Sequence, residues 1–228
     1  MERRAPASGR TRDPLVAVFD LDGTLTRRDT LLPYVMGFLL RHPARLPRLL
    51  GVVPACVLFL LRRADHGALK SAFIRMSLGG RRRAELEAWT ARFVQRLLVR
   101  GMFADALKRL EYHRAHADFL VLLSASTDLY VPQIGRALGF AQSVCTGLEW
   151  DGDVLVGRLS TPNRRGEEKV RCVEQLRAQH PRRLFAAYGN SGSDVPHLRM
   201  ADRPLLVNGR RAARAAAARY GIPRASWR

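Results

Sequence analysis

The sequence predicts an α/β fold, in which helices cover a sheet of parallel strands and a helical unit is inserted after the first strand. Two observations support this prediction. Short apolar runs that end in polar residues alternate with amphipathic stretches of helical length, a pattern typical of parallel strands joined by helices. Between the first two apolar runs, residues 31–103 are rich in Leu, Val, Arg and Ala and show almost no strand pattern.

The expected strands are buried, because each is a continuous apolar run rather than an alternating one. They cover residues 15–19, 118–123 and 183–188, and they run into Asp20, Ser124 and Gly189. Ligands of parallel α/β sheets bind beyond the carboxyl ends of the strands. We therefore expect the three polar ends to contribute to one shared site in a Rossmann-like core.

Helices are expected wherever apolar residues recur at helical spacing. Outside the insertion these stretches are residues 103–117, 129–138, 167–179, 195–200 and an Ala/Arg-rich, solvated stretch at 210–219. Within the insertion, Pro33, Pro43, Pro47 and Pro54 break the first half into short helices, since proline ends or kinks a helix. Residues 83–99 predict a longer helix with one apolar face, formed by Leu86, Trp89, Phe93 and Leu97.

One further signature precedes Lys169. Residues 143–150 and 154–160 flank Asp151-Gly152-Asp153, which predicts a β-hairpin. The expected organisation is a core of residues 15–30 and 104–228, with a helical cap of residues 31–103. Residues 1–14 are basic and polar and lack the apolar region of a signal peptide, so we expect a short disordered tail there.

The charge of the chain is strongly positive. The formal net charge is +19, and residues 31–103 alone hold 13 Lys/Arg against three acids. Such a field favours anionic partners, namely nucleic acid, acidic lipid head groups or phosphorylated small molecules. Arginine occurs 36 times, whereas lysine occurs only at Lys70, Lys108 and Lys169. A lysine in this chain therefore merits separate attention.

Cysteine usage and hydropathy argue against three classes of protein: zinc-binding, disulfide-bonded and membrane-spanning proteins. The three cysteines form no CxxC pair, so neither a zinc site nor a disulfide framework is expected, and a reducing cytoplasm fits. The longest uncharged stretch, residues 49–61, has 13 residues, short of the roughly 20 that cross a bilayer. We expect no transmembrane helix, while peripheral contact at the inner membrane face stays open.

Asp20 and Asp22 are the candidate catalytic residues, in the sequence Phe19-Asp20-Leu21-Asp22-Gly23-Thr24. A carboxylate at the end of a buried strand can attack phosphorus, and a second carboxylate can protonate the leaving oxygen and then activate water. Two carboxylates repel an anionic phosphate. The scheme therefore needs a divalent cation and donors around the phosphate oxygens.

The later strand ends and helix starts supply those partners. Ser124 can donate to a phosphate oxygen, Lys169 can neutralise both the phosphate and the nucleophile, and Asp194 can hold Mg²⁺. Along the chain, four motifs follow one another: Asp20-Leu21-Asp22-Gly23-Thr24, then Ser124, then Lys169, then Gly189-Asn190-Ser191-Gly192-Ser193-Asp194. In that order the chain resembles the haloacid dehalogenase superfamily over nearly all of residues 15–208.

The resemblance implies a role for each matching residue. Asp20 is the nucleophile and Asp22 the general acid/base, which the dehalogenases of the superfamily lack, so phosphate-ester cleavage is expected. Thr24, Ser124 and Lys169 bind phosphate. Asp20, the Asp22 backbone carbonyl and Asp194 hold Mg²⁺, with Asn190 as a direct or water-mediated ligand. Asn190 replaces a carboxylate of the family pattern, which puts the strength of metal binding in doubt.

An all-helical cap in this position looks like the branch that contains phosphoserine phosphatase. Three features look most like the phosphatidylglycerophosphatase C group: residues 124–130, the hairpin and residues 163–170. The implied activity is Mg²⁺-dependent hydrolysis of a phosphomonoester through an aspartyl-phosphate, with a phospholipid head group such as phosphatidylglycerophosphate as the leading substrate. The basic, apolar cap agrees with a substrate at an anionic membrane.

Two alternatives stay open. One is a phosphatase for a soluble ester such as phosphoserine, in which Asp29 would sit where that branch carries a substrate-binding glutamate; Asp29 is equally well a surface acid. The other is a non-catalytic, basic module that binds nucleic acid or a membrane surface, although no motif for specific nucleic-acid binding occurs. Ser126 is read mainly as a helix cap, and no role is assigned to the six histidines.

Overall fold

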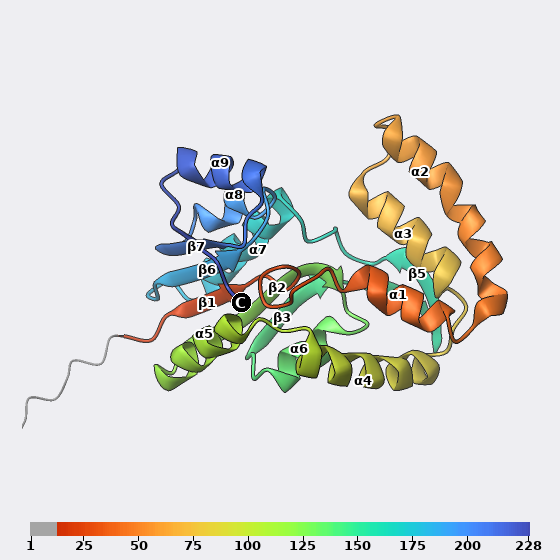
Figure 1. The fold of residues 1–228 in the computed structure, drawn as a ribbon, viewed down its shortest axis with the longest axis horizontal. Coiled ribbons are helices and arrows are strands. Elements are labelled where there is room, and N and C mark those ends of the chain that lie inside the picture. The colour runs from red at the N-terminus through yellow and green to blue at the C-terminus, as the bar shows by residue number, and fades with distance from the viewer. Residues whose placement is uncertain (1–12) are drawn as a thin grey trace, which may run out of the picture.

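The computed structural model describes residues 13–228 (Figure 1). Most of the predicted tail, residues 1–12, lies outside the described residues. The main sheet has six parallel strands in the order β3-β2-β1-β6-β7-β8. These strands are β1 Val16–Phe19, β2 Phe119–Thr127, β3 Gln142–Thr146, β6 Phe185–Gly189, β7 Arg203–Val207 and β8 Arg224–Ala225. The predicted α/β class is confirmed.

Strand β1 lies at the centre of the sheet, and its four residues are fully buried. Val16 pairs with Phe119 of β2 on one side and with Phe185 of β6 on the other. This register brings the carboxyl ends of β1, β2 and β6 to one edge of the sheet.

Helices cover both faces of the sheet, as the alternation along β1 requires. Val16 and Val18 face a cluster formed with α7, α8 and α9, whereas Ala17 and Phe19 face a cluster formed with α5 and α6. The helices are α5 Ala104–Ala115, α6 Val131–Ala137, α7 Glu167–Gln179, α8 Val195–Leu198 and α9 Arg211–Arg219.

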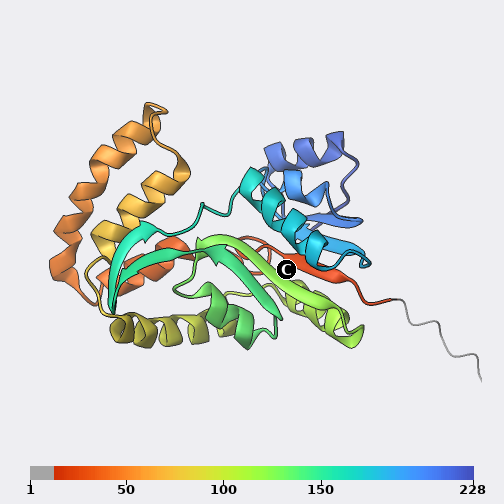
Figure 2. The ribbon, with the colours of Figure 1, turned by 180° about the vertical axis from the view of Figure 1, so that it is seen from behind.

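The insertion after β1 is helical and forms a lobe beside the sheet (Figures 1 and 2). It consists of α1 Leu31–Leu39, the 3-10 helix η1 Pro43–Val52, α2 Val53–Leu60, α3 His66–Ser77 and α4 Arg83–Arg100. Pro43 starts η1, as expected for a proline that limits a helix. The other three prolines do not break the helices as predicted: Pro33 and Pro54 lie in the first turns of α1 and α2, and Pro47 lies inside η1. In α4, Leu86, Trp89 and Phe93 are buried on the predicted face.

The hairpin pairs β4 Leu148–Asp151 with β5 Val154–Leu159 and belongs to the same lobe. The amide of Gly80 donates to the Leu155 carbonyl at 2.8 Å, and the amide of Arg83 donates to the Asp153 carbonyl at 2.8 Å. The cap lobe is thus built from two separate parts of the sequence.

The run of residues 143–150 differs from the prediction of one strand. Its first part is β3, which pairs with β2 in the main sheet, and its last part is β4 of the hairpin. The chain changes direction at Gly147, where an added Cβ would lie 2.6 Å from the Ser160 hydroxyl. The close approach of these two segments explains why a glycine stands between β3 and β4.

One helical stretch in the described part of the chain is long and apolar enough, by length and composition, to cross a membrane. It runs from Pro43 to Leu60 through η1 and α2, with a mean hydropathy of 1.5. A single stretch of this kind is weak evidence for a membrane span.

Candidate active site

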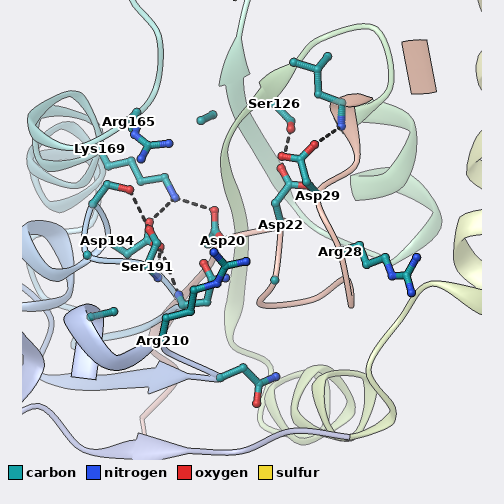
Figure 3. Close-up of a pocket in the computed structure, with 18 of the residues that line it drawn as sticks. Asp20, Asp22, Arg28, Asp29, Ser126, Arg165, Lys169, Ser191, Asp194 and Arg210 are labelled. Atoms are coloured by element: carbon teal, nitrogen blue, oxygen red, sulfur yellow. Dashed lines mark hydrogen bonds and ion pairs between the residues drawn. The ribbon is translucent and has the colours of Figure 1, made fainter. Parts of the chain in front are cut away.

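A cavity of about 770 Å³ opens at the carboxyl ends of β1, β2 and β6, between the core and the cap lobe (Figure 3). The described residues that line it include both predicted catalytic carboxylates, Lys169, Asn190 and Asp194. The cap contributes Leu31 and Lys70, and the start of α9 contributes Ala212 and Ala213. The structure therefore brings together residues that are up to about 190 positions apart in the sequence.

Asp20 directly follows β1 and is 6% exposed. Its amide donates to the Tyr188 carbonyl at 3.0 Å, which extends the pairing of β1 with β6 past the strand. One carboxylate oxygen accepts from the Lys169 Nζ at 2.6 Å, and the other accepts from the Thr24 hydroxyl at 3.0 Å. Both oxygens are thus held in place beside the cavity.

Lys169 lies in the first turn of α7 and is 3% exposed. Its Nζ donates to Asp20 and, at 2.7 Å, to Asp194 Oδ1 (Figure 3). A buried ammonium needs such partners, because an unpaired buried charge is strongly unfavourable. One cation therefore bridges the predicted nucleophile and the aspartate that follows β6.

The three charges of this bridge shift one another's pKa. Burial raises the pKa of Asp20, although Lys169 opposes the shift, and the neighbouring Asp194 and Asp22 add to it. The pKa of Asp194 is lowered: burial opposes this shift, while the charge of Lys169 and its hydrogen bond favour it. The pKa of Lys169 is raised because its two carboxylate partners outweigh burial. Of the two carboxylates, Asp20 is the one more easily protonated.

Asp22 lies on the loop after β1 and is held by two hydroxyls. The Ser126 hydroxyl donates to Asp22 Oδ2 at 2.6 Å, and the Thr30 hydroxyl and amide donate to Asp22 Oδ1 at 2.6 and 2.7 Å. Burial and the neighbouring Asp29 raise the pKa of Asp22, while these hydrogen bonds lower it, and the net shift is upward. A raised pKa favours the protonated form that a general acid requires.

Sequence reasoning assigned no catalytic role to Thr30 and read Ser126 as a cap. Ser126 lies 104 positions from Asp22, and no spacing within the chain predicts their contact. The signal that could have identified it was the second serine of Ser124-Ala125-Ser126 at a strand end that faces the site.

Ser124 and Thr24 are both fully buried. The Ser124 hydroxyl accepts from the Ser126 amide at 3.0 Å, and Ser126, rather than Ser124, is among the described residues that line the cavity. Strand β2 also continues beyond Ser124 to Thr127. The phosphate-binding roles of Thr24 and Ser124 stay predictions.

Asn190 follows β6 and packs against the catalytic loop. An added Cβ at Gly23, whose φ is +78°, would lie 1.9 Å from the Asn190 Nδ2, so only glycine fits there. The Asn190 and Ser191 amides donate to Asp194 Oδ2 at 3.2 and 2.9 Å, and the Ser191 hydroxyl donates at 2.7 Å. The turn 190–194 thereby fixes the Asp194 carboxylate, and the Asn190 side chain lies against Gly23.

The oxygen groups at this edge fit Mg²⁺, which is commonly bound by one or two carboxylates, water and substrate phosphate. Within residues 13–228 no cluster of three or more His, Cys, Asp or Glu side chains could hold a metal. Candidate ligands are therefore Asp20, the Asp22 carbonyl and the Asn190 amide oxygen. Asp194 is predicted as a ligand too. Like Asp20, which accepts from Lys169 and Thr24, it already accepts hydrogen bonds, from Lys169 and Ser191.

Asp29 lies at the rim of the cavity and is exposed. Its Oδ1 accepts from the Leu31 and Leu32 amides at 3.0 and 3.2 Å. These bonds satisfy free amides at the start of α1. Asp29 is thus a helix cap in this structure, whichever role it has toward a substrate.

Cationic side chains surround the cavity. Besides Lys169, they are Arg27, Arg28, Lys70, Arg165 and Arg210. Lys70 reaches in from α3, and its Nζ donates to the Ala125 carbonyl and to Asn163 Oδ1, both at 2.6 Å. Burial lowers the pKa of Lys70 to about 8, although Asp22 opposes the shift. Two of the three lysines in this arginine-rich chain therefore lie in the site.

His197 on α8 is 1% exposed, and neither ring nitrogen has a hydrogen-bond partner among the described residues. Its Nδ1 lies 3.9 Å from Asp194 Oδ1. Burial and the nearby Lys169 lower the pKa of His197 to about 3. The ring is therefore neutral at physiological pH and packs behind Asp194.

Comparisons with known proteins agree with this geometry. A family model for haloacid dehalogenase-like hydrolases matches residues 17–199. Protein CicA of Caulobacter vibrioides is 30% identical over 191 residues, covering 83% of this chain and 84% of its own. A Mycobacterium tuberculosis protein named a probable phosphatase is 25% identical over 224 residues, covering 96% and 78%.

Solved structures share the fold. A Bordetella pertussis protein of unknown function superposes with a TM-score of 0.78 at 24% identity, covering 93% of this chain and 98% of its own. A probable phosphoserine phosphatase of Vibrio cholerae superposes with a TM-score of 0.68 at 11% identity, covering 91% and 61%. At these identities the likeness concerns the fold alone.

Proposed function

The chain belongs to the haloacid dehalogenase-like hydrolases, and from that premise we propose that it is a Mg²⁺-dependent phosphatase that acts through an aspartyl-phosphate. The observation that carries the proposal is the bridge in which one buried lysine holds both Asp20 and Asp194 beside the cavity. This arrangement presents one carboxylate oxygen and one ammonium to an entering phosphate.

In the first step an Asp20 oxygen attacks phosphorus, and the bond between phosphorus and the ester oxygen breaks. The leaving oxygen takes a proton from Asp22, whose raised pKa keeps a protonated fraction available. Asp22 then accepts a proton from water, and the water oxygen attacks the phosphorus of the aspartyl-phosphate. Inorganic phosphate leaves and Asp20 is regenerated.

The chain's own donors stabilise the charge on the transferred group. Lys169 lies 2.6 Å from an Asp20 oxygen and is placed to interact with a phosphate oxygen bound there. Thr24 orients the second Asp20 oxygen. When bound, Mg²⁺ would neutralise negative charge shared by Asp20 and the phosphate, with the Asp22 carbonyl and Asn190 as further candidate ligands.

A phospholipid head group with a terminal phosphate is the leading substrate, for which phosphatidylglycerophosphate is an example. Two observations support this choice. Five cationic side chains besides Lys169 line the cavity, more than one phosphate needs, and they suit a second anionic group such as a phosphodiester. The cap also has a long exposed apolar helix that reaches from η1 into α2.

The test is phosphate release from a panel of esters with and without Mg²⁺. The panel compares a lysophospholipid phosphate and phosphatidylglycerophosphate in vesicles with phosphoserine and p-nitrophenyl phosphate in solution. We expect Mg²⁺-dependent release that is fastest from the lipid phosphates and absent in Asp20→Asn. Faster release from phosphoserine would favour the soluble-ester alternative, which the shared fold with phosphoserine phosphatases motivates. No release from any ester would favour a non-catalytic binding module, which the neutral Asn190 motivates.

A further inference from the structure

The outer face of η1 and α2 carries a continuous apolar stripe in the described part of the chain. No residue of α2 is buried, although every position from Val53 to Leu60 is apolar. Most of the exposed side chains follow a spacing of three or four residues, which places them along one side of a helix; Leu58, which is 44% exposed, and Leu61 widen that side. The stripe consists of Leu46 37%, Leu50 73%, Val53 53%, Val57 48%, Leu60 79% and Leu61 60% exposed.

The opposite side of η1 is already occupied. Arg45 is 7% exposed and donates to the Ser77 and Gly79 carbonyls at the end of α3, both at 2.9 Å. An added Cβ at Gly51 would lie 2.5 Å from the Met76 sulfur of the same helix. The stripe is therefore not the misplaced core face of the cap, because the core face is packed on α3.

The stripe is flanked by positive charge. Arg41, Arg48, Arg62 and Arg63 are exposed around it, and residues 31–64 contain no acidic residue at all. An apolar helix face with arginines at its edges has the composition of a helix that lies in the interface of an anionic membrane. Two copies of the chain that paired through this face would bring like charges together, which is unfavourable.

We propose that the stripe on η1 and α2 docks the enzyme on the surface of an anionic lipid bilayer, with the helix parallel to the membrane plane. In this proposal the helix formed by η1 and α2 does not cross the bilayer. Arg45 within it is fixed to α3 by two hydrogen bonds, which a spanning helix would have to break.

The stripe faces away from the active site. In both views α3 lies between α2 and the sheet (Figures 1 and 2). Lys70 of α3 lines the cavity, whereas the inner side of η1 packs on α3. A bilayer parallel to η1 and α2 on their outer side therefore contacts the cap without covering the cavity.

The inference goes beyond the proposed function, and its test does not require catalysis. Full-length protein is sedimented with vesicles of phosphatidylcholine, with and without phosphatidylglycerol. We expect binding only to the anionic vesicles, reduced by added salt because exposed charges are screened. Leu50→Glu with Val57→Glu should lower vesicle binding at least about tenfold, since two apolar side chains lose their burial in lipid.

The matched control is Val99→Glu, which changes a side chain that is 77% exposed on α4, outside the stripe. It should bind vesicles like the wild type, and all three proteins should hydrolyse a soluble ester equally. Equal vesicle binding by the double variant and the wild type would overturn the proposal. The proposal would also be overturned if the wild type does not bind vesicles but forms dimers that the double variant cannot form. Binding by an inactive Asp20→Asn protein would separate docking from catalysis.

Discussion

The floor of the active site and the outer face of η1 and α2 differ in how their side chains are satisfied. At the floor, Asp20, Lys169 and Asp194 are at most 6% exposed, and their charges compensate one another through bonds of 2.6 and 2.7 Å. On the outer face, six apolar side chains are between 37% and 79% exposed. The buried charges are thus neutralised within the chain, whereas the outer face leaves apolar surface in contact with solvent.

This contrast separates two questions about a phosphatase. In the proposed mechanism the reaction depends on the carboxyl ends of β1, β2 and β6, where Asp20, Asp22 and Asp194 lie beside Lys169 of α7. In the same proposal, access of the substrate depends on the cap, through Lys70 and the stripe. Substitutions of the buried charged residues should therefore reduce both activity and stability, while substitutions at Lys70 and in the stripe should change substrate binding and membrane binding.

The largest effect is expected for Lys169→Met. It leaves the Asp20 and Asp194 carboxylates buried without their cation, which costs about 3–5 kcal/mol of unfolding free energy, and it removes a donor to the phosphate, which lowers kcat by about 10³. Urea unfolding and steady-state kinetics measure the two effects. Lys108→Met is the matched control, because the Lys108 side chain is 80% exposed. Equal losses of unfolding free energy and kcat in the two variants would contradict the role of Lys169 as the cation that pairs with Asp20 and Asp194.

Ser126→Ala tests the positioning of Asp22. Loss of the 2.6 Å bond should lower kcat by about ten- to a hundredfold, as expected when a general acid loses its orientation. The bond lowers the pKa of Asp22, so its loss should raise that pKa. Because the first step needs protonated Asp22, the alkaline limb of kcat/KM should move to higher pH. Ser126→Thr, which keeps the hydroxyl, should restore the profile; a profile unchanged by Ser126→Ala would contradict this role.

Lys70 should give a smaller effect, confined to substrate binding. Because its pKa is lowered to about 8, its charge is present below that pH and lost above it. KM for an ester with a second anionic group should therefore rise above pH 8, whereas kcat should change little. Lys70→Met should raise KM about tenfold at pH 7, while Lys70→Arg should keep a low KM and abolish its rise with pH. A kcat effect with unchanged KM would assign Lys70 to the chemistry instead.

The smallest effect on the folded chain is expected at the stripe. Leu50→Glu should change the free energy of unfolding by less than about 0.5 kcal/mol, because Leu50 is 73% exposed and exposed substitutions have little effect. Thermal unfolding in lipid-free buffer measures this. A loss comparable to that of Leu86→Ala, at a buried position of α4, would mean that the stripe packs within the protein.

Much of the core could be predicted from the sequence because its signals are local. Strand β1 is an apolar run cut off by Asp20, and α7 begins and ends where its pattern does, at Glu167 and Gln179. The strands β7 and β8 were not predicted: β7 begins with Arg203-Pro204 and β8 has only two residues. Their strand character comes from pairing with β6 and with each other, which no local pattern records.

The motif residues of the site could be predicted from the sequence, but the contacts between its side chains could not. Asp20, Asp22, Lys169, Asn190 and Asp194 all border the cavity, because the carboxyl ends of parallel strands meet at one edge. The hydrogen-bond partners of Asp22, by contrast, depend on how the loop after β1 packs against β2, and Lys70 is contributed by the cap. Contacts between side chains of separate elements produce no characteristic spacing in the sequence, so they could not be predicted from it.

The most direct measurement is the trapping of the phosphorylated enzyme. Wild-type protein is mixed with a radiolabelled ester and Mg²⁺ and quenched in acid, and its peptides are analysed. We expect label on the peptide that contains Asp20, sensitive to hydroxylamine as an acyl phosphate is, and none in Asp20→Asn. Phosphate release without label on that peptide, or with undiminished rate in Asp20→Asn, would contradict the assignment of Asp20 as the nucleophile.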